Sequence, residues 1–526
     1  MVVPSLSPSP ARKRAIDSLS APEPAASARA AEDVLDTPAA GGLVIRGGSL
    51  RLLGYAAMVG LSILMAAVLT RHLGVGRFGF YTTVMSVAAV VAAVTDAGIS
   101  TFATREYAVM RGAERDALMA DLLTVRVALT LCGVAFTTGF ALAAGYQRAL
   151  VFGAVTAGLA TVPLAVQHTL TIPLQADLRL GAVAALDLAR QVLWVGAVVA
   201  LSTVGAGVFP LLSILLAVNL ILIVPTARLV RGRISIKLAF RPSVWPQLLV
   251  PTAVYSVATA VGVIYAYMAQ ILTSLVTSHH QSGLFAVSFR VFVVSVTVPA
   301  MLAGAALPVL ARAARDDPER LRYALQRIFD MLVLAGIGAA LAISAGSGFI
   351  VSVIAGSAYS ASAPVLAIQA TALVGSFLAA GWSFALLSLR LHRELLAANG
   401  AALVVSTVLT LALARSGGAQ GAAIASVCGE ATLAAGTGLA LFGPRREFRP
   451  QLGVAMKAVV AGAIAGVIAM APPMPSVARA VVAVAVYGLA LVGLKAVPSE
   501  LRELLSSDAW RLISSVRPPR SRAGEA

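Results

Sequence analysis

The run ILMAAVLTRHLGVGRFGFYTTVMSVAAVVAAVTD, residues 63–96, decides between two folds. At its centre, GVGRFG (74–79) spells G-x-G-x-x-G, the dinucleotide-binding fingerprint, and Asp96 follows it. That fingerprint requires a buried strand before the glycines and a helix that starts among them. Here apolar runs of about 20 residues flank the glycines, which is the length of a membrane helix and too long for a typical strand. The glycines therefore predict a tight turn between two membrane helices rather than a nucleotide site.

The whole chain has the composition of a membrane protein. Of its 526 residues, 59% are hydrophobic and 12% are charged, whereas soluble domains average roughly 25% charged residues. The net charge is +17, but the basic residues stand between apolar runs rather than on one water-facing patch, so we expect no nucleic-acid partner. Cys132 and Cys428 lie in apolar runs and are interpreted as small buried hydrophobes. The cysteines and the five histidines show no ligand spacing, so we expect no metal and no cofactor.

Apolar segments long enough to cross about 30 Å of hydrocarbon recur from residue 50 onward. They are 52–70, 79–101, 120–144, 149–173, 182–204, 208–229, 249–276, 284–310, 326–346, 364–388, 397–414, 419–441, 454–471 and 477–496. Residues 1–46 are rich in Pro, Ala and Ser and predict a disordered tail. Residues 498–516 place leucines on one helical stripe and predict a helix on the membrane surface, with a solvated helix as the alternative.

The positive charge alternates from loop to loop. With the N-terminus in the cytoplasm, the cytoplasmic loops hold twenty Arg and Lys residues and the opposite loops hold five. The positive-inside rule therefore predicts a cytoplasmic N-terminus. Because the number of spans is even, the C-terminus is predicted to be cytoplasmic as well.

The order of loops and spans repeats within the chain. GFYTTVMSV (79–87) aligns with GLFAVSFRV (283–291) at an offset of 204 residues, and Gly205 aligns with Gly418 at an offset of 213. We predict an all-α integral membrane protein with about 14 transmembrane helices, arranged as two six-helix repeats plus two C-terminal helices. Both halves share one orientation, which places the substrate site between them. The predicted domains are a disordered cytoplasmic tail (1–46), an N-terminal half (47–232), a C-terminal half (233–443), two extra helices (444–496) and a cytoplasmic tail with an amphipathic helix (497–526).

Two segments follow the opening helix, RHLGVGRFGFYTTVMSV (71–87) and TDAGISTFATRE (95–106). They resemble the oligosaccharide flippases of the polysaccharide-biosynthesis group, which share a superfamily with lipid II flippases and multidrug and toxin extruders. They show the group's Leu-Gly turn, its G-x-Y start of the second helix, and an Asp-x-Gly followed by an Arg. The resemblance implies that helices one, two, seven and eight line a central cavity, where lipid II flippases place arginines for a pyrophosphate. Arg290 matches such a position on the eighth helix and Arg51 on the first, whereas the second helix has no mid-membrane arginine.

Charged residues inside the spans are the candidate site residues, because an arginine at the bilayer centre costs about 2.5–3.5 kcal/mol and usually faces a cavity or a partner. Arg290 has no acidic residue within a helical turn and is interpreted as a substrate contact, with a structural ion pair or snorkelling as the alternative. Arg51 and Arg126 are further substrate-binding candidates, although both lie near an inner end where they can snorkel.

Four further charges are candidates for ion coupling or for structural neutralisation. Asp187 and Arg190 share a helix face and are expected to pair, and a structural pair is also favoured for Arg126. Asp96 lies toward the inner end of the second helix, and Glu430 lies in the middle of the twelfth. Glu430 is interpreted either as the partner of an arginine or as an ion-coupling carboxylate.

The predicted function is a flippase of the bacterial inner membrane that moves an undecaprenyl-diphosphate-linked glycan from the inner to the outer leaflet by alternating access. Arginines attract a diphosphate through charge-assisted hydrogen bonds. The alternatives are a lipid II flippase and a multidrug and toxin extruder. A glycan polymerase or ligase would need a large external loop with acid–base residues, and the predicted external loops are short, so we expect no enzyme. The expected partners are the lipid-linked glycan, membrane lipids, and a polysaccharide polymerase or glycosyltransferases.

Overall fold

The computed structural model describes residues 38–496, except 97–98, 144, 146, 178, 233–240, 242–244, 246–249, 251–252, 317, 444, 446–447 and 472. The predicted surface helix at 498–516 and most of the predicted N-terminal tail lie outside the described residues. The chain divides into two compact units, residues 1–58 and 59–526. The described part of the first unit is the beginning of helix α2, and the rest of α2 and all later described helices belong to the second unit.

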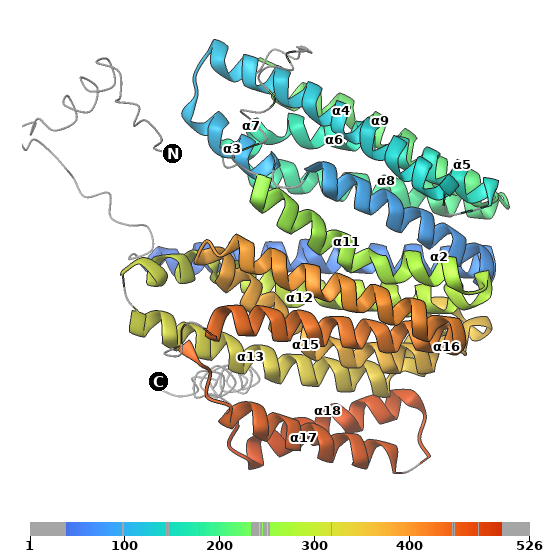
Figure 1. Ribbon diagram of the computed structural model, residues 1–526, viewed down its shortest axis with the longest axis vertical. Helices are drawn as coiled ribbons and strands as arrows, with labels where there is room; N and C mark the ends of the chain where they lie inside the picture. Colours follow the sequence, from blue (N-terminus) through green and yellow to red (C-terminus); the bar gives the residue numbers. More distant parts are fainter. Residues whose placement is uncertain are drawn as a thin grey trace, which may run out of the picture. The chain divides into compact units, whose positions relative to one another are not determined.

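The helices follow the predicted spans in order (Figure 1). Among the described residues, twelve helical segments are long and apolar enough to cross a membrane. Two of these, in α2 and α16, contain a sharp bend, so that all fourteen predicted spans fall on helices. The elements are α2 (Pro38–Asp96), α3 (Ile99–Val109), α4 (Ala113–Ala143), α5 (Arg148–Leu159), α6 (Thr161–Leu170), α7 (Ile172–Ala176), α8 (Leu180–Thr203), α9 (Val208–Val230), α11 (Ala253–Val276), α12 (His279–Asp316), α13 (Pro318–Ala345), α14 (Ser347–Ala355), η3 (Ser357–Tyr359), α15 (Ser362–Ser388), α16 (His392–Phe442), α17 (Gly453–Met470) and α18 (Ser476–Gly493).

The GVGRFG segment forms the turn that the sequence predicts. Gly74 has a φ of 70° and a ψ of 174°, outside the helical region, and α2 doubles back at this point (Figure 1). Such a φ favours glycine because a Cβ would be strained there. Helix rather than strand precedes the glycines, so the described structure has no dinucleotide fold at this motif. We call the parts of α2 before and after Gly74 its first and second arms.

Turns at corresponding places support the predicted repeat. Gly205 lies between α8 and α9 with a φ of 74°, and its aligned partner Gly418 bends α16 with a φ of 54°. Both glycines therefore adopt left-handed backbone between the fifth and sixth spans of their own halves. We keep the names first half for residues 59–232 and second half for residues 253–442.

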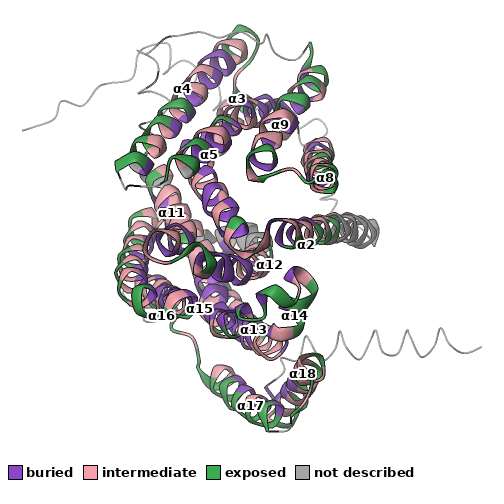
Figure 2. Cartoon of the chain, turned by 90° about the vertical axis from the view of Figure 1, so that its right-hand side faces the viewer, coloured by how far each residue is buried: buried purple, intermediate pink, exposed green. Residues whose placement is uncertain are grey.

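The faces of the helices that no other helix covers are apolar. Figure 2 shows exposed residues along the outer sides of helices such as α4 and α17. On α4 these include Leu131 and Phe136, and on α17 they include Met456 and Val467. In a bilayer such a face meets hydrocarbon rather than water. Cys132 lies on the uncovered side of α4 and is exposed, so the prediction that it is buried is wrong. The reason is that apolar residues of a membrane helix can face lipid as well as the protein interior.

The two halves touch through a pair of glycines. We call the end of the bundle that carries the loops around Arg111 and Arg322 the basic end, and the other the opposite end. At the opposite end, the second arm of α2 lies so close to α12 that a Cβ on Gly79 would be 2.6 Å from the backbone nitrogen of Gly283. A Cβ on Gly283 would in turn be 2.7 Å from the carbonyl carbon of Val75. The two glycines are the residues that the 204-residue offset aligns.

Hydrogen bonds reinforce this contact between the halves. Thr70 Oγ1 in the first arm of α2 donates to the carbonyl oxygen of Ile354 at 3.0 Å, and the Tyr359 hydroxyl donates to the carbonyl oxygen of Thr70 at 3.3 Å. Burial raises the pKa of Tyr359, which keeps the phenol protonated as a donor. The opposite end of the bundle is therefore closed by direct contacts between the first and second halves.

Candidate functional site

Arg290 lies on α12 among residues from the four helices that the resemblance implies. Its Nη2 donates to Ser62 Oγ, on the first arm of α2, at 3.2 Å. Tyr81 on the second arm of α2 and Tyr267 on α11 are near enough to interact electrostatically with the guanidinium. We call these four residues the Arg290 cluster. They come from the first, second, seventh and eighth spans.

The positive charge of Arg290 has no acidic partner among the described side chains. The ion pairs in this part of the chain involve other residues, and Ser62 is the hydrogen-bond partner of Arg290. The buried Tyr81 hydroxyl likewise has no hydrogen-bond partner among the described atoms. A charge within a membrane span and a buried hydroxyl are costly unless they are paired. The Arg290 cluster is therefore suited to an anionic group with several oxygen acceptors.

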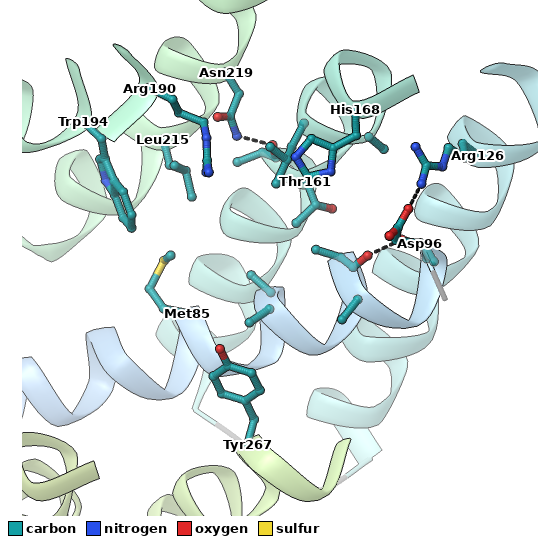
Figure 3. A pocket seen from close by; sticks show the side chains of 18 residues that line it. Met85, Asp96, Arg126, Thr161, His168, Arg190, Trp194, Leu215, Asn219 and Tyr267 are labelled. Atoms are coloured by element: carbon teal, nitrogen blue, oxygen red, sulfur yellow. Dashed lines mark hydrogen bonds and ion pairs between the residues drawn. The ribbon is translucent and has the colours of Figure 1, made fainter. Parts of the chain in front are cut away.

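A cavity of about 450 Å³ lies next to this cluster and is lined mainly by residues of the first half; Figure 3 shows its lining side chains. Tyr267 belongs both to its wall and to the Arg290 cluster. The cavity lies between the second arm of α2 and helices α4, α6, α8 and α9. Its labelled lining residues are Met85, Asp96, Arg126, Thr161, His168, Arg190, Trp194, Leu215, Asn219 and Tyr267.

Arg126 forms an ion pair with Asp96 on the cavity wall (Figure 3). The Ser100 hydroxyl donates to Asp96 Oδ1 at 2.6 Å, and Arg126 Nη1 donates to Thr169 Oγ1 at 3.2 Å. The Arg126 side chain is only 2% exposed. The snorkelling alternative for Arg126 is therefore wrong, because its charge is neutralised inside the bundle. Its predicted contact with substrate stays a prediction.

Arg190 is less completely neutralised than Arg126. Its Nη2 is 3.9 Å from Asp187 Oδ1, so the predicted pair exists but is long for a hydrogen bond. Arg190 Nε and Trp194 Nε1 are buried and lack hydrogen-bond partners among the described atoms. On the neighbouring α9, Asn219 Nδ2 donates to the carbonyl oxygen of Ala160 at 2.8 Å, while its Oδ1 is unpaired. Arg126 Nε is also buried without a partner, so four side chains that line the cavity each carry a buried polar atom with no hydrogen-bond partner among the described atoms.

Glu430 lies away from this cavity, in the second half. Its Oε1 accepts a hydrogen bond from Tyr265 on α11 and its Oε2 accepts one from Ser376 on α15, each at 2.8 Å. Of the two interpretations left open for Glu430, an arginine partner is not found among the described residues, where two hydroxyl groups donate to the carboxylate instead. Ion coupling at Glu430 stays a prediction. Arg51 lies in the first unit, and its side chain is not among those described.

Sequence reasoning did not single out Ser62, Tyr81, Tyr267, Trp194 or Asn219. Tyr81 did carry a signal, because it is the tyrosine of the G-x-Y motif that supported the resemblance. The other four are uncharged side chains within apolar runs, where only the helices packed around them give them a role. Among the described residues, no group of three or more His, Cys, Asp or Glu side chains is placed to hold a metal ion.

Solved structures with the same fold are membrane transporters. The lipid II flippase MurJ in an inward closed conformation matches with a TM-score of 0.69 and 12% sequence identity, over 84% of this chain and 98% of that one. An inward-facing multidrug resistance MATE family transporter of the MOP superfamily matches with a TM-score of 0.52 and 14% identity, over 75% and 94%. A MATE transporter of Vibrio cholerae matches with a TM-score of 0.52 and 13% identity, over 75% and 94%. At these identities the likeness shows the fold alone.

The sequence itself identifies the family. No curated protein matches this chain. The family model described as polysaccharide biosynthesis protein matches residues 68–364, which include the second arm of α2, the cavity and the Arg290 cluster except Ser62. This match spans more than half of the 526 residues and agrees with a fold found in flippases and transporters. The chain is a multi-pass membrane protein that belongs to the polysaccharide biosynthesis protein family.

Proposed function

We propose that the protein is a flippase that moves an undecaprenyl-diphosphate-linked glycan from the inner to the outer leaflet of the bacterial inner membrane, for the synthesis of a cell-surface polysaccharide. The proposal rests on one observation above all, the unpaired positive charge of Arg290 among residues of the first, second, seventh and eighth spans. A diphosphate is a good partner for this charge, because ionised oxygens make the strongest hydrogen bonds to a guanidinium.

The neighbouring cavity is suited to the glycan. Trp194 and Tyr267 provide aromatic surface, and Arg190, Trp194 and Asn219 line the cavity and each carry a buried polar atom without a hydrogen-bond partner. Sugar rings carry hydroxyl groups on otherwise apolar faces and match such a lining. Because Tyr267 joins the two places, a diphosphate at Arg290 brings the first sugar to the mouth of the cavity.

Alternating access gives this binding site a transport cycle. The contact between the halves closes the opposite end, which faces the outside in the orientation that the positive-inside rule favours. We propose that the substrate enters while this end is closed and leaves after the halves rock apart there. With the inside negative, outward movement of one negative charge gains about 2.3 kcal/mol per 100 mV, which favours export.

Native mass spectrometry of the full chain, purified in mild detergent from cells that make the polysaccharide, tests this proposal. We compare the unmodified protein with Arg290→Gln, which keeps a hydrogen-bonding group near Ser62 but removes the charge. Arg415→Ala is the matched control, because Arg415 is an exposed arginine at the opposite end. We expect a co-purified polyprenyl-diphosphate glycan with the unmodified protein and the control, and at least a tenfold smaller bound fraction with Arg290→Gln.

The mass of the bound lipid separates the rival functions. A lipid II mass would identify the chain as a lipid II flippase, with the role of Arg290 unchanged. An organic cation in place of a phospholipid-like anion would overturn the proposal in favour of a multidrug extruder. Equal lipid binding by the unmodified protein and by Arg290→Gln would show that the diphosphate contacts other residues.

A further inference from the structure

A second cavity, of about 580 Å³, lies at the basic end between α13 and α17. It belongs to helices other than those of the Arg290 cluster. The loop before α17 forms its third wall, and the cavity lies beside the ends of the predicted spans 326–346 and 454–471. Its lining residues are Glu319, Arg322, Tyr323, Gln326, Arg327, Asp330, Arg449, Gln451, Gly453, Val454 and Lys457.

Positive charge dominates this lining. The four cationic side chains are Arg322, Arg327, Arg449 and Lys457, against the two acidic side chains Glu319 and Asp330. Asp330 is buried, and its Oδ1 accepts a hydrogen bond from Gln326 Nε2 at 2.9 Å, so part of its charge is already satisfied. Arg322, Arg449 and Lys457 are exposed at the mouth of the cavity. An anion that enters therefore meets a net excess of positive charge.

Lys457 Nζ donates to the carbonyl oxygen of Lys495 at 3.5 Å. Two further contacts hold the lining in place without any ligand. Gln326 makes two hydrogen bonds to the loop before α17. Its Nε2 donates to the carbonyl oxygen of Gln451 at 3.1 Å, and its Oε1 accepts from the backbone N–H of Gln451 at 2.7 Å. The guanidinium of Arg327 lies over the ring of Tyr323, 5.1 Å from its centroid. The hydrogen bonds to Gln451 hold the backbone two residues after Arg449 and so limit the movement of Arg449. The contact with Tyr323 orients Arg327.

The helix beneath the cavity presents an apolar stripe. Lys457, Val460, Ile464 and Ile468 follow one another at spacings of three or four residues and so share one side of α17. Val460 is 49%, Ile464 42% and Ile468 44% exposed. The stripe therefore begins at a cation and continues as a lipid-facing apolar surface toward the middle of the membrane.

We propose that this cavity is a binding site for an anionic glycerophospholipid of the surrounding membrane. Its phosphate group lies on Arg322, Arg449 and Lys457, and one acyl chain follows the stripe on α17. A basic pocket between membrane helices at the headgroup level is the type of site that binds such lipids. The apolar stripe favours a lipid over free phosphate. The inference stands on the membrane fold and does not depend on what the protein transports.

The test is lipid binding to the purified full chain, measured by native mass spectrometry during titration with phosphatidylglycerol or phosphatidylcholine. The pocket variant combines Arg322→Gln, Arg449→Gln and Lys457→Gln. The matched control removes three exposed charges elsewhere at the basic end, by Arg111→Gln, Arg228→Gln and Arg393→Gln. We expect the dissociation constant for phosphatidylglycerol to rise at least tenfold in the pocket variant and less than twofold in the control.

A second variant addresses the acyl chain and leaves every charge in place. Ile464→Trp fills the stripe, and we expect it to weaken phosphatidylglycerol binding at least threefold while the thermal unfolding midpoint stays that of the unmodified chain. The proposal is overturned if the control loses binding as the pocket variant does, or if phosphatidylcholine binds as tightly as phosphatidylglycerol. It is also overturned if inorganic phosphate at equal concentration displaces the lipid, or if both the pocket variant and Ile464→Trp bind as the unmodified chain does.

Discussion

Gly283→Ala adds one methyl group at the place where the two halves touch. A Cβ on Gly283 would overlap the carbonyl oxygen of Val75 and lie 2.7 Å from its carbonyl carbon, whereas ordinary contacts of a Cβ lie at 3.4–4 Å. The obstacle is backbone, so no side-chain rotation relieves it. Helix α12 and the second arm of α2 must therefore move apart, because packed interiors leave no spare room.

The size of the effect follows from this geometry. An overpacked contact costs about 1–3 kcal/mol. This cost falls only on the conformation in which the opposite end is closed, and a difference of about 1–3 kcal/mol between two conformations changes their ratio by about 5–150-fold. We therefore expect Gly283→Ala to populate a conformation that is open at this end.

Electron paramagnetic resonance distance measurement detects such a change. Spin labels on Arg77→Cys and Arg415→Cys report across the opposite end, because both positions are exposed there and belong to different halves. The native cysteines, Cys132 and Cys428, are replaced by serine. In lipid nanodiscs, we expect the spin-labelled protein that keeps Gly283 to give one short distance between the labels. Gly283→Ala should add a second, longer distance.

Gly139→Ala is the matched control, because nothing lies within 4 Å of a Cβ built on that glycine of α4. It should leave the distance distribution unchanged. The reasoning is refuted if folded Gly283→Ala gives the distribution of the unmodified protein, since the glycine contact would then not hold the halves together. A longer distance in the Gly139→Ala control would refute it as well.

Two predictions concern ion pairs. Asp96→Ala leaves the guanidinium of Arg126 buried without its partner, and we expect the free energy of unfolding to fall by about 2 kcal/mol. This value is below the range for a fully buried pair because the Asp96 side chain is 40% exposed. An unchanged thermal unfolding midpoint would contradict the prediction. Arg241 binds the two carboxylate oxygens of Asp121 at 3.0 and 2.9 Å, and its side chain is 47% exposed against 5% for Asp121. Removing Arg241 leaves a buried, unpaired carboxylate, whereas removing the charge of Asp121 leaves an arginine that water can solvate. Arg241→Gln should therefore lower the thermal unfolding midpoint more than Asp121→Asn, and the reverse order would contradict the prediction.

The membrane fold could be predicted because its main signal is local. A span is a run of apolar residues of sufficient length, and GVGRFG interrupts such a run without any need for distant contacts. The fourth span shows the limit of this signal. The sequence predicts a single helix over 149–173, but the structure divides it into α5, α6 and α7. Pro163 and Pro173 fall in the first turns of α6 and α7, where proline is tolerated, so a uniformly apolar composition conceals two helix ends.

The candidate site could be predicted only by charge, because the neutralisation of a charge depends on distant helices. Three arginines within spans stand out in the sequence, yet Asp96 lies 30 residues from Arg126, and Ser62 lies 228 residues from Arg290. Only the packed bundle shows that Arg126 is paired with a carboxylate and that Arg290 is hydrogen-bonded to a hydroxyl. This difference separates a charge that stabilises the fold from one that still requires a partner. Under the function that we propose, Arg290 is therefore where an anionic substrate would gain most from binding, between the two halves that alternating access requires to move.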